Sequence, residues 1–337
     1  MTPLASANED IQKLRVLVEN VDYSPTLRLW HKNKEILETE GYKIWLANLG
    51  NLDFCLGLDL LPRSSVGTLA AWNKTIPHVC SKNIDNSYYA SRIIDAHQSV
   101  FQSDLSLEPC NPELGKRKQL GPTKQVILDT TGGPRMVRGD LKRCEVALTF
   151  DDGPHPMYSR ELLEILEKEN VHANYFVVGR MVRRHPVIAD DIAKAGHIIG
   201  NHSYSHKDFH KFPFKETKAE IVNGFRELLK IWDFTTPFFR FPYGAHTKKT
   251  RAFNKSRDVA EFFWNMDTRD WGIKDRKALL RNTLKEIDRE KRGILLFHDV
   301  HPQTIDIMPK VLVALREAGY TTAVFVPEDL IEDEFPN

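Results

Sequence analysis

Short apolar segments of strand length alternate with longer amphipathic segments along the second half of this chain. The amphipathic segments have helical periodicity, as in Ser159–Asn170, which opens on a serine cap, and Met308–Gly319, which stops at glycine. The apolar segments are Glu145–Phe150, Ala173–Val178, His197–Asn201, Pro237–Phe241, Glu261–Met266, Gly293–His298 and Thr321–Val326. Seven strands that alternate with helices predict a parallel α/β domain, either a barrel or an open doubly wound sheet.

The first part of the 337-residue chain does not follow this pattern. Residues 111–140 are rich in Pro, Gly, Lys and Arg, which indicates a connecting segment. We therefore expect two parts: an N-terminal accessory region and linker over 1–140, whose fold the sequence leaves unassigned, and a catalytic domain over 141–337.

Composition restricts the partners and leaves the compartment open. The formal net charge is +1, which gives no bias towards nucleic acid, and no apolar run approaches the roughly 18 residues of a membrane span. The first residues lack a secretory leader, as expected of a cytoplasmic protein or of a chain whose leader has been removed. The four cysteines are Cys55, Cys80, Cys110 and Cys144. The sequence leaves open whether they form disulfides or remain free thiols.

Polar side chains gather where five of the predicted strands end. They are Asp151 and Asp152, His202 and His206, Arg240, Asp267 and Asp270, and His298 and Asp299. The carboxyl ends of parallel strands share one face of an α/β barrel, and active sites are built on that face. Each residue alone has a structural explanation, such as a surface histidine pair or a buried ion pair, but those explanations do not account for the shared position.

Three of these residues have the chemistry of a metal site. Two histidines and a carboxylate, His202, His206 and Asp152, make a three-point site with open positions for water and substrate. The i, i+4 spacing of the histidines lets them converge if one helical turn follows the strand. Asp151 is then left unligated as a base. The same donors also form the facial triad of non-haem iron enzymes, although such chemistry needs neither a spare carboxylate nor a distant His–Asp pair.

Five ordered motifs, TFDDGP, HSYSH, RFPYG, DTRDW and LLFHD, together resemble the polysaccharide deacetylase family, carbohydrate esterase family four. The resemblance spans about Glu145 to Val326 and implies a distorted (β/α) barrel with about seven strands. It implies a metal site formed by Asp152, His202 and His206, filled by Zn²⁺ or by Co²⁺ or another divalent ion.

The resemblance also implies the catalytic roles. Asp151 is the general base, held by Arg240, and His298 is the general acid, oriented by Asp270. The remaining implied residues contact the substrate: the backbone N–H of Tyr243 at the oxyanion, and Trp271 and Leu296 around the acetyl group.

The implied reaction is metal-dependent hydrolysis of N-acetyl groups on the sugars of a polysaccharide. Peptidoglycan is the expected polymer, with chitin or an exopolysaccharide as the alternatives. An inactive sugar-binding module is the remaining hypothesis. We expect no nucleic-acid partner and no membrane span, and an extracytoplasmic location with the leader removed.

Overall fold

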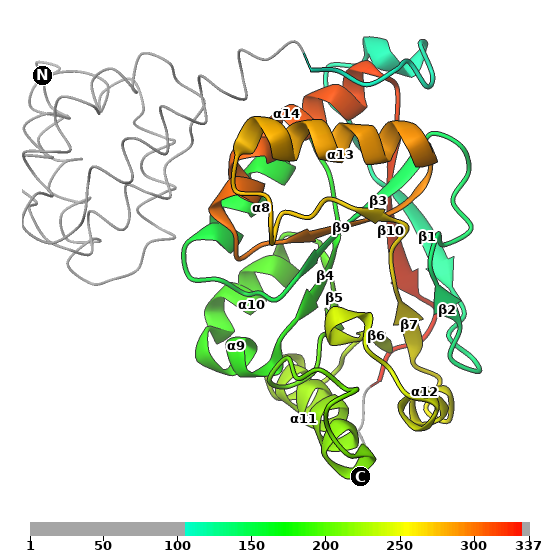
Figure 1. Cartoon of the computed structure of the whole chain (residues 1–337), viewed down its shortest axis with the longest axis vertical. Coiled ribbons are helices and arrows are strands. Elements are labelled where there is room, and N and C mark those ends of the chain that lie inside the picture. Colours follow the sequence, from blue (N-terminus) through cyan, green and yellow to red (C-terminus); the bar gives the residue numbers. More distant parts are fainter. Residues whose placement is uncertain (1–104, 332–337) are drawn as a thin grey trace, which may run out of the picture. The chain divides into compact units, whose positions relative to one another are not determined.

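The computed structural model describes residues 105–331 of the chain (Figure 1). The strands are β1 Lys124–Leu128, β2 Arg135–Met136, β3 Glu145–Asp151, β4 Asn174–Val177, β5 Ile198–Asn201, β6 Phe238–Arg240, β7 Ala260–Phe262, β8 Met266–Asp267, β9 Gly293–His298 and β10 Thr321–Pro327. None of the helices in this part of the chain is long and apolar enough to cross a membrane.

The helices lie around the outside of the strands (Figure 1). They are α8 Tyr158–Lys168, α9 Gly179–Arg184, α10 Pro186–Lys194, α11 Phe214–Trp232, α12 Lys248–Lys255, α13 Arg276–Glu290 and α14 Pro302–Glu317, with short 3-10 turns η2 Leu114–Lys116 and η3 Pro242–Gly244. Neighbours contact one another in the order α13, α14, α8, α10, α9, α11, α12, like the outer ring of an α/β barrel.

The sheet is parallel throughout its named strands and confirms the predicted α/β class. Pairing runs from β8 through β9, β3, β4, β5 and β6 to β7, while β10 pairs with the first residues of β3. Within the described residues no ladder joins β7 to β8, so backbone hydrogen bonds do not close the barrel. The predicted strand Glu261–Met266 is interrupted at 263–265 and contributes to both β7 and β8.

β3 lies at the centre of this arrangement. Every residue after Glu145 in it is buried, as expected of a parallel strand covered on both faces. Phe150 of β3 packs against Tyr175 and Phe297 of the two adjacent strands, with ring centroids 5.1 and 5.7 Å apart. Asp151 therefore ends a buried central strand, and Asp152 follows it directly.

Two local predictions are wrong. Ser159 does not cap α8, whose N-cap position is Met157; its hydroxyl instead donates to Asp299. Residues 111–140 are more than a connecting segment, because β1 pairs with β10 and β2 pairs with β7. The sheet therefore extends N-terminal to the proposed boundary at residue 140.

A disulfide joins Cys110 to Cys144, which lies immediately before β3. The prediction on Cys55 and Cys80 lies outside the described residues. Because the bridge links positions 34 residues apart, replacing both cysteines (Cys110→Ala with Cys144→Ala) is expected to lower the free energy of unfolding by about 2–4 kcal/mol. Urea denaturation of the double variant beside the oxidised parent measures this difference. Coincident unfolding midpoints would contradict the prediction.

Candidate active site and metal centre

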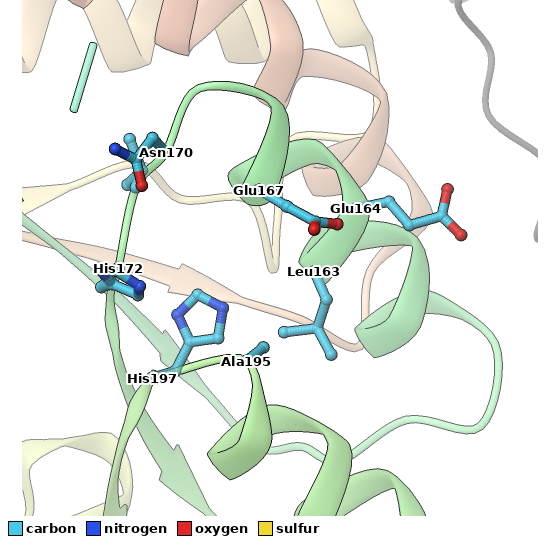
Figure 2. Close-up of a pocket in the computed structure, with 8 residues that line it drawn as sticks. Leu163, Glu164, Glu167, Asn170, His172, Ala195 and His197 are labelled. Atoms are coloured by element: carbon cyan, nitrogen blue, oxygen red, sulfur yellow. The ribbon is translucent and has the colours of Figure 1, made fainter. Parts of the chain in front are cut away.

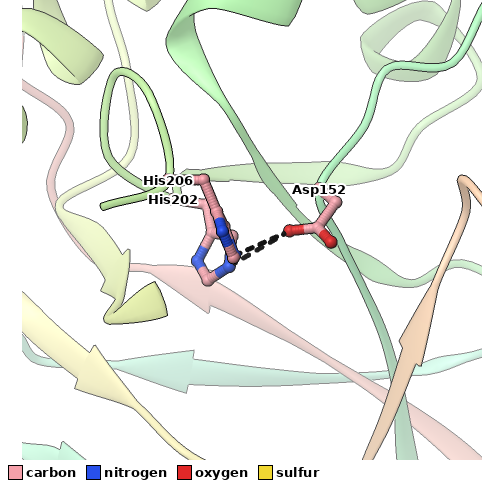
Figure 3. Close-up of side chains that lie close together, drawn as sticks. All are labelled: Asp152, His202 and His206. Atoms are coloured by element: carbon pink, nitrogen blue, oxygen red, sulfur yellow. Dashed lines mark ion pairs between the residues drawn. The ribbon is translucent and has the colours of Figure 1, made fainter. Parts of the chain in front are cut away.

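Asp152, His202 and His206 come together at the carboxyl ends of β3 and β5 (Figure 3). The Oδ1 atom of Asp152 lies 3.5 Å from Nε2 of His202 and 3.1 Å from Nε2 of His206. Donor atoms that surround one tetrahedral ion at zinc-like bond lengths lie about 3.4 Å apart. Asp152 is therefore at the required spacing from both histidines, and all three donor atoms lie within 4.8 Å of one another.

The donor atoms also have the right chemical state. Asp152 Oδ1 is buried and accepts no hydrogen bond within residues 105–331. His202 donates through Nδ1 to the carbonyl oxygen of Arg240 at 2.8 Å, which leaves the lone pair of Nε2 directed at the site. Burial lowers the pKa of His202 to about 4, so the imidazole is neutral at physiological pH. The residues present fit a divalent cation.

The loop that carries the two histidines is not the helical turn that their spacing predicted. His202 continues from β5, but Ser203 and His206 adopt left-handed conformations, with φ of 67° and 62°. The Ser203 hydroxyl accepts the backbone N–H of His206 at 3.0 Å and closes the loop. The histidines meet through this closed loop and not through helical i, i+4 geometry.

Asp151 and Asp152 face different partners because the backbone turns sharply between them. Asp152 has φ of 78°, while Asp151 still belongs to β3. Asp151 Oδ1 accepts from Nη1 of the fully buried Arg240 at 2.7 Å, and its Oδ2 lies 3.6 Å from Nε2 of His202. The guanidinium also binds Thr149 and the carbonyl oxygen of Phe263. One aspartate is thus held by a fixed cation, and the other faces the imidazoles.

His298 lies beside Asp151, because the two residues are register partners in the β3–β9 ladder. Its Nδ1 donates to Asp270 Oδ1 at 2.7 Å, and its backbone N–H donates to Oδ2 at 2.7 Å. Thr304 adds a hydroxyl donor to the same carboxylate. Burial opposes protonation of His298, but the hydrogen bond and charge of Asp270, together with the charges of Asp152 and Asp151, raise its pKa to about 9. The ring is accordingly protonated at neutral pH.

The three predicted substrate contacts occupy different environments. Tyr243 lies in η3 with φ of 58°, is 69% exposed, and packs edge-on against the ring of His206 at 4.6 Å. Trp271 follows Asp270 and is 56% exposed. Leu296 is buried in β9 two residues before His298 and therefore projects to the same side of that strand. Two exposed aromatic rings and one buried aliphatic side chain thus adjoin the polar groups.

Asp299, the residue after His298, packs against the segment that follows β3. It is fully buried, and its carboxylate receives the hydroxyl of Ser159, which in turn accepts the backbone N–H of His155 at 2.7 Å. A Cβ at Gly153 would lie 2.3 Å from Asp299 Oδ2, so only glycine fits there. In the sequence, the signals for this close contact between Gly153 and Asp299 are the glycine of the TFDDGP motif and the aspartate after His298.

The three possible metal ligands, the Asp151–Arg240 pair and the His298–Asp270 pair together define a class of enzyme. A metal triad beside a carboxylate paired with arginine and a protonated histidine paired with aspartate is suited to metal-assisted hydrolysis. Residues 138–261 match the polysaccharide deacetylase family profile. The chain therefore carries a polysaccharide deacetylase domain.

Individual relatives support the assignment. A peptidoglycan-N-acetylglucosamine deacetylase of Bacillus cereus is 30% identical over 185 residues, which are 54% of this chain and 66% of that protein. A peptidoglycan-N-acetylmuramic acid deacetylase of Bacillus subtilis is 30% identical over 205 residues, 61% of this chain but only 42% of that protein. The structure of a peptidoglycan deacetylase of Bdellovibrio bacteriovorus has a TM-score of 0.64 and 25% identity, and the match covers 98% of this chain and 96% of that one.

Proposed function

We propose that this protein removes N-acetyl groups from the sugars of peptidoglycan, with Asp151 as general base and His298 as general acid. The observation that carries the proposal is that the two adjacent aspartates have different partners: Asp152 faces the imidazoles of His202 and His206, whereas Asp151 is bound by the buried Arg240. Asp270 orients His298 through the Nδ1 hydrogen bond, which leaves Nε2 to act on the substrate.

A divalent cation held by Asp152, His202 and His206 would polarise the acetamide carbonyl and acidify the attacking water. Asp151 accepts the proton of that water as the C–O bond forms. The Tyr243 backbone N–H supports the developing oxyanion, and Leu296 and Trp271 surround the acetyl methyl group. His298 then protonates the departing nitrogen as the C–N bond breaks, so the products are acetate and a free amine on the sugar.

Zn²⁺ is the proposed ion, because two imidazoles and one carboxylate are a frequent ligand set of catalytic zinc; Co²⁺ accepts the same donors. The iron-oxygenase alternative gives no role to Asp151 or to the His298–Asp270 pair, so the geometry disfavours it. Elemental analysis of the purified protein tests this assignment. One equivalent of iron with little zinc or cobalt would contradict it.

Peptidoglycan is the proposed substrate because the similar proteins named above carry peptidoglycan in their names. Acetate release from purified peptidoglycan, chitin oligomers and a soluble N-acetylated exopolysaccharide, measured in parallel, tests it. We expect the fastest release from peptidoglycan. Faster release from either of the other two would reassign the substrate, and no release from any of them by metal-loaded protein would favour an inactive sugar-binding module.

We further propose that the protein acts outside the cytoplasm. The Cys110–Cys144 disulfide supports this, because structural disulfides persist mainly in oxidising compartments. Trapping thiols with an alkylating reagent in intact producing cells tests the proposal. Free thiols at both cysteines in the native host would contradict it.

Removing the charge of Asp270 is expected to change the pH dependence of the reaction. A general acid works only while protonated, so activity falls as pH rises through the pKa of His298. Asp270→Asn deletes the carboxylate that holds this pKa up, and we expect the alkaline limb of kcat to move to lower pH by about 1–3 units. The pH profile of the metal-loaded variant measures this shift.

The matched control is Asp267→Asn in the same motif. Its Oδ1 contacts only the backbone N–H of Arg269 at 2.9 Å among the hydrogen bonds of residues 105–331. This variant should keep the parental alkaline limb. An unmoved limb in Asp270→Asn, or an equal displacement in Asp267→Asn, would remove His298 from the role of acid.

A further inference from the structure

The two histidines of the metal site are supported very differently by the surrounding protein. His202 continues the β5 strand: its backbone N–H donates to the carbonyl oxygen of Val177 at 2.9 Å, and its Nδ1 donates to that of Arg240. No comparable partner of the His206 Nδ1 atom is found among residues 105–331. Within residues 105–331, the ring of His206 faces Asp152 and packs against His202 and the exposed Tyr243. Its position therefore depends on the backbone of its loop.

That backbone is in a conformation that needs external support. Ser203 and His206 both have left-handed φ, which costs roughly 1–2 kcal/mol for each residue with a side chain. Such conformations persist where the surroundings over-determine them. The hydrogen bond from the His206 N–H to the Ser203 hydroxyl is internal to the loop and does not fix the loop to the rest of the protein.

Part of the external support is backbone: the N–H groups of Gly179 and Arg180 donate to the carbonyl oxygens of Ser203 and Tyr204, both at 2.9 Å. Glu220 of α11 supplies the support closest to His206. Its Oε2 accepts the backbone N–H of Ser205 at 2.7 Å, and its Oε1 accepts the Ser205 hydroxyl at 2.7 Å. Its backbone carbonyl oxygen accepts the N–H of Tyr204 at 3.0 Å. On the other side of His206, Nζ of Lys207 lies 3.9 Å from Oε1. Glu220 is 7% exposed, so water competes little for these bonds.

We propose that Glu220 is a positioning residue that holds the Ser203–His206 loop so that His206 completes the metal site with Asp152 and His202. The inference rests on the metal site of the proposed function. Both oxygens of one carboxylate bind the residue immediately before His206. The same part of α11 is also bound to the end of β5, because Asn201 Nδ2 donates to the carbonyl oxygen of Ile221 at 2.9 Å. Helix α11, which is bound to the end of β5, thus positions His206, a proposed ligand that lies beyond the end of that strand.

The proposal predicts that a carboxylate is required and not merely a side chain of that size. Glu220→Gln keeps the volume but has a single acceptor oxygen, so its amide group must face the N–H or the hydroxyl of Ser205. The Ser205 hydroxyl must then turn and accept from the amide NH2 group, and both bonds to Ser205 lose their charge-assisted character, which is expected to loosen the loop. Groups that orient metal ligands without contacting the ion typically contribute 10–100-fold to metal affinity.

The test is a Co²⁺ titration of metal-free full-length protein, followed by the visible absorption of bound Co²⁺ and by its dissociation constant. We expect Glu220→Gln to bind Co²⁺ roughly 10–100-fold more weakly, with an altered visible spectrum that reports changed coordination. Ser205→Ala, which keeps only the backbone donor, should give a smaller change in the same direction. Glu227→Gln is the matched control, because Glu227 is also buried on α11 but pairs with Lys230 at 2.9 Å; its affinity and spectrum should equal those of the parent.

The outcomes separate this inference from the proposed function. A parent protein that does not bind one Co²⁺ overturns the metal site itself. A parent that binds Co²⁺ while Glu220→Gln keeps the parental affinity and spectrum overturns only the role of Glu220, as does an equal weakening in Glu227→Gln. If Glu220→Gln does not fold, Ser205→Ala decides, and unchanged affinity and spectrum in that variant overturn the proposal.

Discussion

Asp151→Asn is expected to lower kcat by about 10²–10⁴-fold, the usual contribution of a positioned general base. Asparagine has nearly the same shape and can still accept from Arg240, so the site should keep its geometry, but an amide cannot take a proton from the attacking water. Metal should remain bound, because Asp151 is not one of the three proposed ligands. Acetate release per bound metal ion, measured with saturating substrate, gives the comparison.

The variant also weakens a buried ion pair, which lowers stability independently of catalysis. Asp306→Asn controls for this effect, because Asp306 is a buried aspartate that pairs with Arg276 at 2.7 Å in the outer helix α14. We expect both variants to unfold at a lower temperature and only Asp151→Asn to lose turnover. Near-parental kcat in Asp151→Asn would show that another group accepts the proton.

The sequence predicts the strand ends well because a parallel sheet leaves a strong local pattern. The segment Gly293–His298 coincides with β9, and the groups that follow β3, β5, β6 and β9 do meet in space. Apolar runs bounded by turn residues and polar groups at their carboxyl ends are local features, so the local sequence contains them. Because the carboxyl ends of parallel strands lie on one face of the fold, the polar groups at those ends are brought together.

The predictions fail where nonlocal contacts decide the structure. The His-x-x-x-His spacing suits a helix, but hydrogen bonds that Ser205 donates to Glu220, fourteen residues beyond His206, support a left-handed loop instead. The short apolar run in Lys124–Leu128 lies among residues rich in Pro, Gly, Lys and Arg, and it joins the sheet by pairing with β10, almost 200 residues later. Glu220 itself lies in an ordinary amphipathic helix, and no motif distinguishes it.

Removing one imidazole of the triad is expected to abolish stable metal binding. His206→Ala leaves Asp152 and His202 as the only two proposed ligands, and the affinity for Zn²⁺ should fall by more than about 100-fold, beyond the loss caused by groups that only orient a ligand. Acetate release should fall with metal occupancy, because the acetamide carbonyl and the water then lack their electrostatic activation. Elemental analysis after dialysis, together with a competition titration against a chromophoric chelator, measures the change.

His210→Ala is the matched control, since His210 lies four residues further along the same segment, is exposed, and contacts the carbonyl oxygen of His246 at 3.1 Å. Its metal content and turnover should equal those of the parent. Full metal occupancy in His206→Ala would have a specific meaning, because Asp151 Oδ2 lies 3.6 Å from His202 Nε2. The ion would then be held by both aspartates and His202, Asp151 would be a ligand instead of the base, and the division of labour between the adjacent carboxylates would be wrong.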